Sequence, residues 1–259
     1  MIRRSAFRPF RAIRWSISNE SEKGVRSIFH HGAVRAADRK MDLTPFSVKR
    51  TRVKICGLRD PAHARIAAGE GADAIGLVFW EPSPRFVAPE LAAKVAAALP
   101  PFVAAVGLFV DAAEARVREV LSKVPLDLLQ FQGDEPPDFC ARFGKPYVRA
   151  VRMEKGTDLL EYARRFSSAK ALLLDAHSPA APGGTGLTFD WTAIPADFPM
   201  PAILSGGLTA ANVGRAVREV RPWAVDVSSG VESSRGVKDP AKIVEFIRSV
   251  RREDAGQPS

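Results

Sequence analysis

The stretch Val53–Phe79, VKICGLRDPAHARIAAGEGADAIGLVF, contains a complete strand–helix–strand unit. Its two ends, Val53–Cys56 and Ala74–Phe79, are short apolar runs, which is typical of parallel strands buried on both faces. Between them, Pro61–Gly69 begins with proline, a residue favoured at the first position of a helix. Two buried strands joined by a helix predict a parallel sheet built from such units.

The same alternation continues to the end of the chain. Strands are expected at Val53–Cys56, Ala74–Phe79, Ala104–Val110, Leu126–Phe131, Val148–Val151, Ala171–Asp175, Ala202–Leu204 and Ala224–Val227. Helices are expected at Pro61–Gly69, Pro89–Ala98, Ala112–Ser122, Glu135–Phe143, Thr157–Phe166, Ala210–Glu219 and Pro240–Arg251, with at most a short one at Asp190–Ile194. Eight such pairs predict the α/β class and a single (βα)8 TIM barrel.

An open, doubly wound sheet is the alternative architecture. To bind a dinucleotide it would need Gly-x-Gly-x-x-Gly after the first strand. This chain has Cys56-Gly57-Leu58 there, which favours the barrel.

The positive charge of the chain is concentrated at its beginning. The net charge is +9 over 259 residues, but residues 1–50 hold 12 Lys and Arg against 4 Asp and Glu, a net +8. Residues 51–259 hold 26 against 25, a net +1. A nearly neutral body does not predict a nucleic-acid partner. The sequence thus predicts a basic N-terminal tail at 1–50, disordered or arising from a start assigned too far upstream, and a catalytic barrel at 51–259.

The tail leaves the localisation open between two interpretations. Residues 1–19 hold five arginines, three serines and no acidic residue, which is the composition of an organellar transit peptide. The alternatives are an inert basic extension or a true start at Met41, and with these we expect a cytoplasmic protein. The most apolar long stretch, Leu91–Val110, is interrupted by Lys94, Pro100 and Pro101, so no membrane span is expected.

The barrel rule also selects candidate site residues, because active sites lie at the C-terminal ends of the strands. Cys56 ends the first strand and Asp175 the sixth, and a thiol and a carboxyl can divide the roles of base and acid. The simpler interpretations are a buried apolar cysteine and a helix-capping carboxylate. The two cysteines, Cys56 and Cys140, have no zinc-like spacing, so no metal site is expected.

Glycine-rich turns follow three neighbouring strands and predict a phosphate site. They are Gly183–Gly186, Ser205–Gly207 and Ser228–Gly230. Glycine allows backbone N–H groups to approach a phosphate closely, and loops after strands seven and eight form the phosphate site of many such barrels. The residues alone therefore predict a small phosphorylated ligand.

Eight motifs in order resemble one family, the phosphoribosylanthranilate isomerases of tryptophan biosynthesis. The motifs are Val53–Gly57, Gly76–Phe79, Ser83–Arg85, Val106–Val110, Leu173–Asp175, Gly183–Gly186 with Thr188–Trp191, Leu204–Leu208 and Val225–Glu232. The resemblance covers about residues 52–251. It implies a cofactor-free Amadori rearrangement of N-(5-phosphoribosyl)anthranilate to 1-(2-carboxyphenylamino)-1-deoxyribulose 5-phosphate, the third step from chorismate to tryptophan.

The resemblance also implies residue roles. Cys56 is the expected general base, Asp175 the general acid, and Arg85 the ligand of the anthranilate carboxylate. The other expected substrate contacts are Gly184, Gly186, Gly206, Gly207, Ser228, Ser229 and Gly230. Because an ordinary thiol is mostly protonated at neutral pH, we expect a neighbour to lower the pKa of Cys56, and Lys54 lies on the same face of the strand.

Two positions depart from the family pattern. Gln132 replaces the usual histidine after the fourth strand, and Leu187 replaces the usual lysine. A glutamine cannot exchange a proton near neutral pH. The remaining alternatives are another phosphosugar isomerase and a barrel that binds a phosphosugar without catalysis. The expected partner is the small-molecule substrate, and the expected assembly is a monomer or a homodimer.

Overall fold

The structure is a computed structural model that describes residues 50–176 and 188–256, all within one compact unit that runs from Asp42 to Ser259. Apart from Arg50, the expected basic tail lies outside the described residues, and so do Gly184, Gly186 and Leu187.

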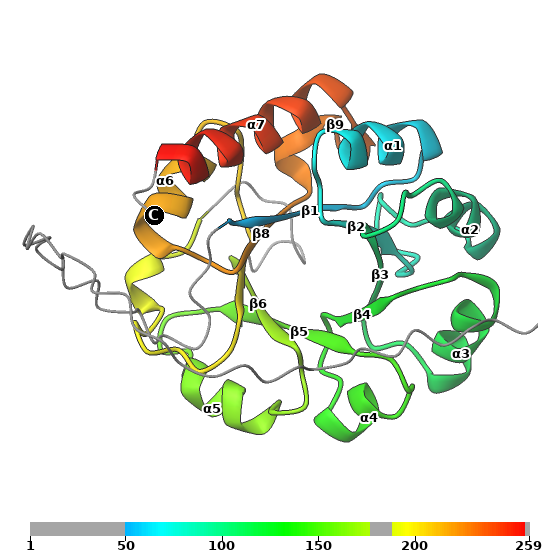
Figure 1. The fold of residues 1–259 in the computed structure, drawn as a ribbon. Helices are drawn as coiled ribbons and strands as arrows, with labels where there is room; N and C mark the ends of the chain where they lie inside the picture. The colour runs from blue at the N-terminus through cyan, green and yellow to red at the C-terminus, as the bar shows by residue number, and fades with distance from the viewer. Residues whose placement is uncertain (1–49, 177–187, 257–259) are drawn as a thin grey trace, which may run out of the picture. The chain divides into compact units, whose positions relative to one another are not determined.

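Eight parallel strands close into a barrel in chain order (Figure 1). The strands are β1 (Arg52–Cys56), β2 (Ala74–Val78), β3 (Ala104–Phe109), β4 (Leu128–Phe131), β5 (Tyr147–Met153), β6 (Ala171–Ala176), β7 (Ala202–Leu204) and β8 (Ala224–Val227). β8 pairs with β1 through the register Lys54 opposite Asp226, which closes the ring. The expected TIM barrel is confirmed, and no strand end differs from its expected position by more than two residues.

Helices surround the barrel on the outside (Figure 1). They are α1 (Pro61–Gly69), α2 (Pro89–Ala97), α3 (Glu114–Lys123), α4 (Pro137–Ala141), α5 (Leu159–Arg165), α6 (Val213–Val220) and α7 (Pro240–Gly256). Short 3-10 helices occur at Trp191–Ala193 and Ser229–Val231. None of the helices within the described ranges is long and apolar enough to span a bilayer.

Four helices (α3, α4, α5 and α6) begin two or three residues later than expected, and local contacts explain two of these differences directly. Asp158 caps α5 by accepting a hydrogen bond from the Glu161 N–H, so the helix begins at Leu159 and not at Thr157. The Asn212 side chain accepts from the Thr209 N–H and donates to the Gly207 carbonyl, so the chain turns there before α6. Pro136 precedes α4 in an extended conformation, and the helix begins with Pro137.

Alternation along β6 shows how the strands position the site. Leu172 and Leu174 pack in the layer between strands and helices, whereas Ala171 and Leu173 belong to the small cluster inside the barrel. Successive side chains of a strand point to opposite faces. Asp175 therefore follows Ala171 and Leu173 on the interior face, at the C-terminal end of the strand.

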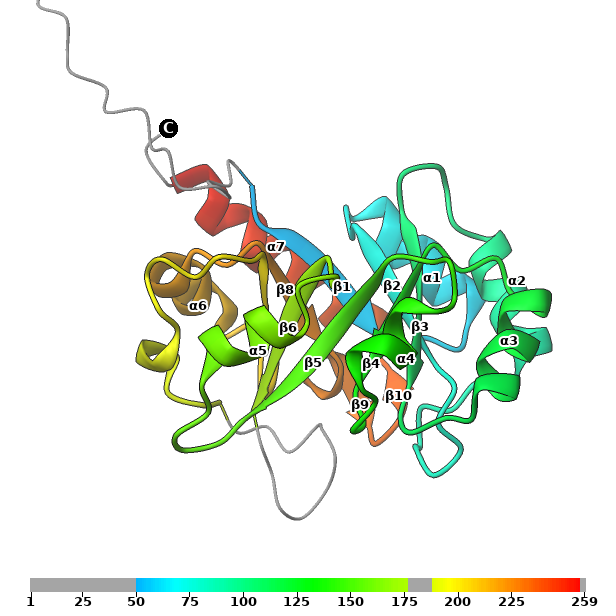
Figure 2. The same ribbon diagram turned by 90° about the horizontal axis from the view of Figure 1, so that it is seen from below.

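A hairpin after β8 was not expected from the sequence. It consists of β9 (Glu232–Ser234) and β10 (Val237–Lys238), which pair antiparallel. Figure 2 shows this hairpin at the lower edge of the barrel. Its turn uses Gly236 at φ 83°, a conformation that glycine adopts readily. Strands of two or three residues are too short to produce a clear pattern in the sequence.

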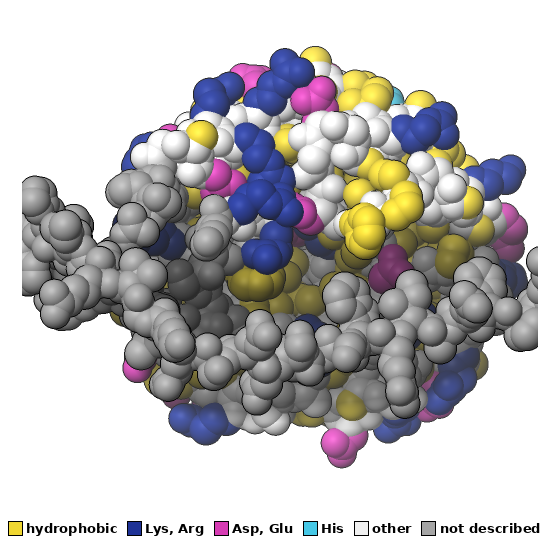
Figure 3. All heavy atoms as spheres, in the orientation of Figure 1, with side chains coloured by type: hydrophobic (Ala, Val, Ile, Leu, Met, Phe, Trp, Pro, Cys, Tyr) yellow, Lys and Arg dark blue, Asp and Glu magenta, His cyan; other side chains and the backbone are white. Residues whose placement is uncertain are grey.

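The surface of the barrel agrees with the near-neutral charge of residues 51–259. On the described part of the face seen in Figure 3, Lys and Arg side chains lie among Asp, Glu and apolar side chains. No large patch of side chains with the same charge is visible on that part of the face.

Candidate active site

Most of the expected site residues line one pocket at the C-terminal ends of the strands. Cys56, Arg85, Asp175, Gly206, Gly207, Ser228 and Ser229 all line it. Its other lining residues include Trp80, Gln132, Arg152, Ser205 and Asp226. Residues from strand ends that are far apart in the sequence thus converge on one space, as the barrel rule predicted.

A buried ion pair lies beside Cys56. Lys54 Nζ donates to Asp226 Oδ1 at 2.8 Å, and Ser205 Oγ donates to Asp226 Oδ2 at 3.2 Å. Lys54 and Asp226 are only 6% and 5% exposed. Lys54, expected on the same face of β1 as Cys56, thus has its ammonium group inside the barrel, where it pairs with Asp226. The sequence analysis did not single out Asp226. An acidic residue within the apolar strand β8 could have indicated a functional position.

The charges around Cys56 act in opposite directions. Burial raises the pKa of the Cys56 thiol, and the Asp226 carboxylate adds to this. Lys54 and Lys238 lower the pKa, but they do not outweigh burial. For Lys54 itself, burial favours the neutral amine, yet the Asp226 carboxylate holds its pKa above the ordinary value. Lys54 therefore acts in the expected direction, while the net pKa of Cys56 in the free protein lies above its ordinary value.

Asp175 carries a perturbed carboxyl. Burial raises the pKa of Asp175 to about 7, and the charge of Asp226 contributes in the same direction. Lys54, the Ala176 N–H and the Gln132 amide lower it, because each favours the charged carboxylate. Asp175 can therefore hold a proton near neutral pH and release it to a ligand, as a general acid must.

Gln132 contacts this carboxyl directly. Its Nε2 donates to Asp175 Oδ2 at 3.0 Å, and its Oε1 accepts from Gln130 Nε2 at 2.9 Å. The residue that departs from the family pattern thus lies against the expected acid. The sequence placed Gln132 at a strand end but did not predict this contact or the part played by Gln130.

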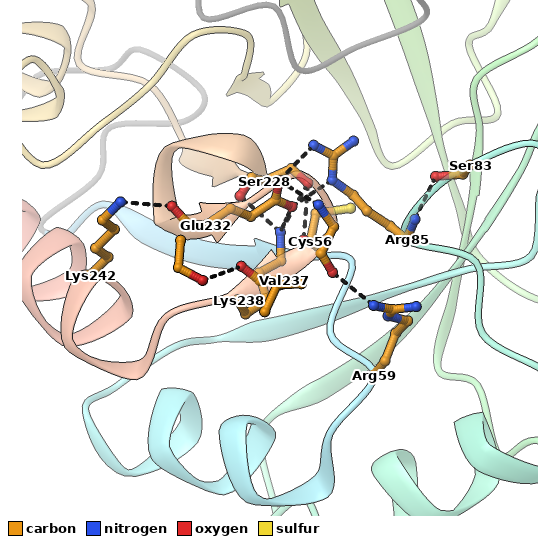
Figure 4. A network of polar contacts seen from close by, with 11 residues as sticks. Cys56, Arg59, Ser83, Arg85, Ser228, Glu232, Val237, Lys238 and Lys242 are labelled. Carbon is orange, nitrogen blue, oxygen red and sulfur yellow. Dashed lines mark hydrogen bonds and ion pairs between the residues drawn. The ribbon is translucent and has the colours of Figure 1, made fainter.

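Arg85 is held by the hairpin β9–β10 (Figure 4). Its Nε and Nη2 donate to the two carboxylate oxygens of Glu232 at 2.7 and 3.0 Å. Lys238 Nζ donates to Glu232 at 2.8 Å and to the Ser228 carbonyl at 2.8 Å. Although burial opposes ionisation, the hydrogen bonds from Arg85 and Lys238 lower the pKa of Glu232 to about 2. Glu232 therefore stays charged and fixes the guanidinium of Arg85 at the edge of the pocket.

The glycine turns after β7 and β8 pack against each other. A β-carbon on Gly230 would collide with the Leu208 carbonyl oxygen, and it would lie 3.2 Å from Thr209 Cα. A β-carbon on Gly206, which has φ 81°, would collide with Ala176 N and lie 2.5 Å from Ala176 Cβ. Both positions require glycine because neighbouring backbone occupies the space of a side chain. Gly230 supports the Leu208 turn and is not itself among the pocket-lining residues.

The described part of the chain has no cluster of side chains suited to a metal ion. Among residues 50–176 and 188–256, no three His, Cys, Asp or Glu side chains lie close enough together to hold a metal ion.

Comparisons with known proteins point to one family. The family model for N-(5′-phosphoribosyl)anthranilate (PRA) isomerase matches residues 53–249. The N-(5′-phosphoribosyl)anthranilate isomerase of Nitrosococcus oceani is 53% identical over 201 residues, which cover 78% of this chain and 98% of that protein. That of Thiobacillus denitrificans is 55% identical over 200 residues, or 77% and 98% of the two chains.

Solved structures extend the comparison to the fold. The crystal structure of phosphoribosyl anthranilate isomerase from Thermotoga maritima has a TM-score of 0.70 and 37% identity, and the match covers 78% of this chain and 99% of that one. A second structure, with a TM-score of 0.68 and 37% identity over the same shares of the two chains, holds reduced 1-(o-carboxyphenylamino)-1-deoxyribulose 5-phosphate. This chain belongs to the N-(5′-phosphoribosyl)anthranilate isomerase family.

Proposed function

We propose that the protein converts N-(5-phosphoribosyl)anthranilate to 1-(2-carboxyphenylamino)-1-deoxyribulose 5-phosphate, the third step from chorismate to tryptophan. The observation that carries the proposal is that Cys56 and Asp175 line the same pocket, with the pKa of Asp175 raised by burial to about 7. A thiol base and a neutral carboxylic acid at one site are what an aldose–ketose rearrangement without a cofactor requires.

Asp175 is the general acid of the first step in this proposal. It transfers its proton to the furanose ring oxygen, and the bond between that oxygen and C1′ breaks. The lone pair of the anthranilate nitrogen forms the C1′=N double bond, so the ring opens to a protonated Schiff base. The pKa of about 7 supports this role, because a carboxyl with an ordinary pKa of 3.8 would already have lost its proton at neutral pH.

Cys56 is the general base of the second step. Its thiolate removes the proton from C2′, and the electron pair of that C–H bond forms a C1′=C2′ double bond while the Schiff-base nitrogen becomes neutral. The resulting enolamine takes a proton at C1′ and loses one from the C2′ hydroxyl, which gives the ketone. The cation of Lys54 supports the thiolate, since it lowers the pKa that burial raises.

The proposed substrate has a phosphate at one end and a carboxylate at the other, so the pocket needs two anion-binding sites. Gly206, Gly207, Ser228 and Ser229 line the pocket and are the proposed phosphate contacts. Gly230, also expected as a contact, is proposed to support this site by letting the two turns pack together. Gly184 and Gly186, outside the described residues, complete the proposed phosphate site. Arg85 is the proposed ligand of the anthranilate carboxylate. Because Glu232 accepts from Nε and Nη2 of Arg85, the Nη1 protons are left for the substrate.

Assembly and localisation are further parts of the proposal. A related structure, 34% identical with a TM-score of 0.66, is described as monomers generated from a dimeric phosphoribosylanthranilate isomerase of Thermotoga maritima. We expect this chain to act as a monomer or a homodimer in the cytoplasm. The basic segment 1–50 is proposed as a tail outside the catalytic barrel.

A fluorescence assay of the purified full chain with freshly prepared phosphoribosylanthranilate tests the function. Turnover is expected for the parent, and a loss of about 10²–10⁴-fold in kcat for Cys56→Ala and for Asp175→Asn. Cys140→Ala is the matched control, since Cys140 is fully buried in α4 away from the pocket. If both site variants keep a kcat close to that of the control, the assignment of base and acid is wrong. If the parent binds a product analogue but shows no turnover, the barrel is a binding protein.

A further inference from the structure

Two glutamine side chains connect the interior of the barrel to Asp175. Gln130 and Gln132 are two residues apart on and just beyond β4, so they share the interior face of the strand. Gln130 is 1% exposed, and its Nε2 donates to Gln132 Oε1 at 2.9 Å. Gln132 Nε2 then donates to Asp175 Oδ2 at 3.0 Å. This inference rests on the proposed role of Asp175.

The amide of Gln132 has one accepting end and one donating end. Because Gln130 donates to Oε1, the NH₂ group of Gln132 is the end that faces Asp175. We propose that Gln132, held in this orientation by Gln130, is a positioning residue that binds Oδ2 of Asp175 and keeps the transferable proton on Oδ1.

The chemistry of the contact explains the preference for Oδ1. An NH₂ group can only donate, so it pairs best with an oxygen that carries negative charge or carbonyl character. When Asp175 is neutral, the carbonyl oxygen is the better acceptor, and the hydroxyl is therefore on the other oxygen. One defined oxygen then delivers the proton, which matters because proton transfer requires the donor within about 2.6–3.2 Å of its target.

Gln132 achieves this without adding a charge. Among the residues that the structure describes, the charged and titratable groups that line the pocket with Asp175 or act on its carboxyl are Asp226, Lys54, Cys56, Arg152 and Arg85. An amide neither competes with Asp175 for the proton nor changes charge between pH 5 and 9. A histidine at this position would add a group that titrates near 6.5. Replacing Gln132 with an apolar side chain of similar length therefore removes its hydrogen bonds to Asp175 and Gln130 without changing the net charge of the pocket.

The test compares Gln132→Met, Gln130→Met and Gln132→His with the parent. For Gln132→Met we expect kcat to fall at least about tenfold with KM changed less than about threefold, because the phosphate contacts are on other loops. The pKa of Asp175 should rise by about one pH unit, since a hydrogen bond to the carboxylate is lost. Gln130→Met should shift both quantities in the same direction by a smaller amount. Gln132→His restores a donor and should recover most of kcat.

The pKa of Asp175 is read without substrate, from the infrared band of its protonated carboxyl, assigned by its loss in Asp175→Asn. Ser168→Ala, which removes a hydrogen bond to Tyr147 on the outside of the barrel, is the control for general loss of stability. A Gln132→Met protein with the parent's kcat and Asp175 pKa overturns the proposal. So does a fall in kcat that follows the thermal midpoint while the Asp175 pKa stays constant. If Asp175→Asn itself remains active, the proposed function fails first, and that result is distinguishable from failure of the positioning role.

Discussion

The dependence of kcat/KM on pH should be bell-shaped. The pKa of Asp175, the general acid, should set the rise on the acid side, and the pKa of Cys56, the general base, should set the fall on the alkaline side. The mechanism needs Asp175 protonated and Cys56 ionised in the same free enzyme. Burial raises the pKa of Asp175 to about 7, and burial also raises the pKa of Cys56 above its ordinary value of 9.0. The acid therefore has the lower pKa, and the two required states coexist only in a minority of molecules.

The fraction of molecules with Asp175 protonated and Cys56 ionised depends on the pKa values of both groups. Between the two pKa values the protonated fraction of Asp175 falls as the thiolate fraction of Cys56 rises, so their product is constant. Because the pKa of Asp175 is about 7 and that of Cys56 is raised above its ordinary value, only a small minority of molecules hold both required states at any pH. An aspartate at its ordinary 3.8 would give a product lower by a further factor of about 10³. The raised pKa of Asp175 is thus expected to be worth about as much as a general acid usually contributes.

The assay is kcat/KM from pH 5.5 to 10.5 at constant ionic strength. We expect a tenfold rise per pH unit below about 7, because the thiolate increases while Asp175 keeps its proton. A plateau should follow, with a fall only above the pKa of Cys56. Because the substrate phosphate titrates near 6, the Asp175 limb is checked by infrared titration of the free protein.

The variant Asp226→Asn tests whether the Asp226 carboxylate contributes to the raised pKa values of Asp175 and Cys56. The Asp226 charge raises the pKa of both Asp175 and Cys56, so both limbs should move to lower pH when it is removed. Glu119→Gln, which removes an exposed carboxylate on α3, should leave both limbs in place. An acid limb near 4, or activity that falls from pH 7 upward, would refute the reasoning.

Four further results are expected. Gly230→Ala should raise KM and weaken inhibition by inorganic phosphate at least tenfold, because the new β-carbon collides with the Leu208 carbonyl and separates the two turns; unchanged inhibition would contradict the phosphate assignment. Arg85→Lys should raise KM more than it lowers kcat, since a single ammonium nitrogen cannot reproduce the planar guanidinium that binds Glu232 through two nitrogens and leaves a third for the substrate; a parental KM would argue against carboxylate binding there. Phe131→Ala should cost about 3–5 kcal/mol of unfolding free energy, because Phe131 is fully buried among aromatic rings, and calorimetry should show a thermal midpoint lower by about 6–20 °C. A chain that starts at Met41 should keep the parent's kcat, and its aggregation or inactivity would show that the preceding segment belongs to the barrel.

Much of the site could be predicted from local sequence. Cys56 and Asp175 were found because apolar strands end at them, and the barrel rule assigns chemistry to such ends. Gly206 and Ser228 were found because glycine-rich turns after neighbouring strands predict phosphate binding. These inferences need only the order of elements along the chain.

The partners of those residues could not be predicted in the same way. Asp226 meets Lys54 across 172 positions, and Glu232 meets Arg85 across 147. Their contacts depend on closure of β8 against β1 and on the short hairpin β9–β10, whose pattern is too brief to detect. The raised pKa of Cys56 was also missed, because the sequence shows the nearby lysine but not how deeply the thiol is buried.

The sequence by itself determined the barrel, the strand ends and the residue types available for chemistry, since apolar periodicity and turn residues act over short stretches of chain. Tertiary structure decided which pKa values are raised, which way the Gln132 amide faces, and which donors of Arg85 remain for a ligand. The physical reason is that burial and charge pairing are properties of the space around an atom, and in a closed barrel that space is filled by strands distant along the chain.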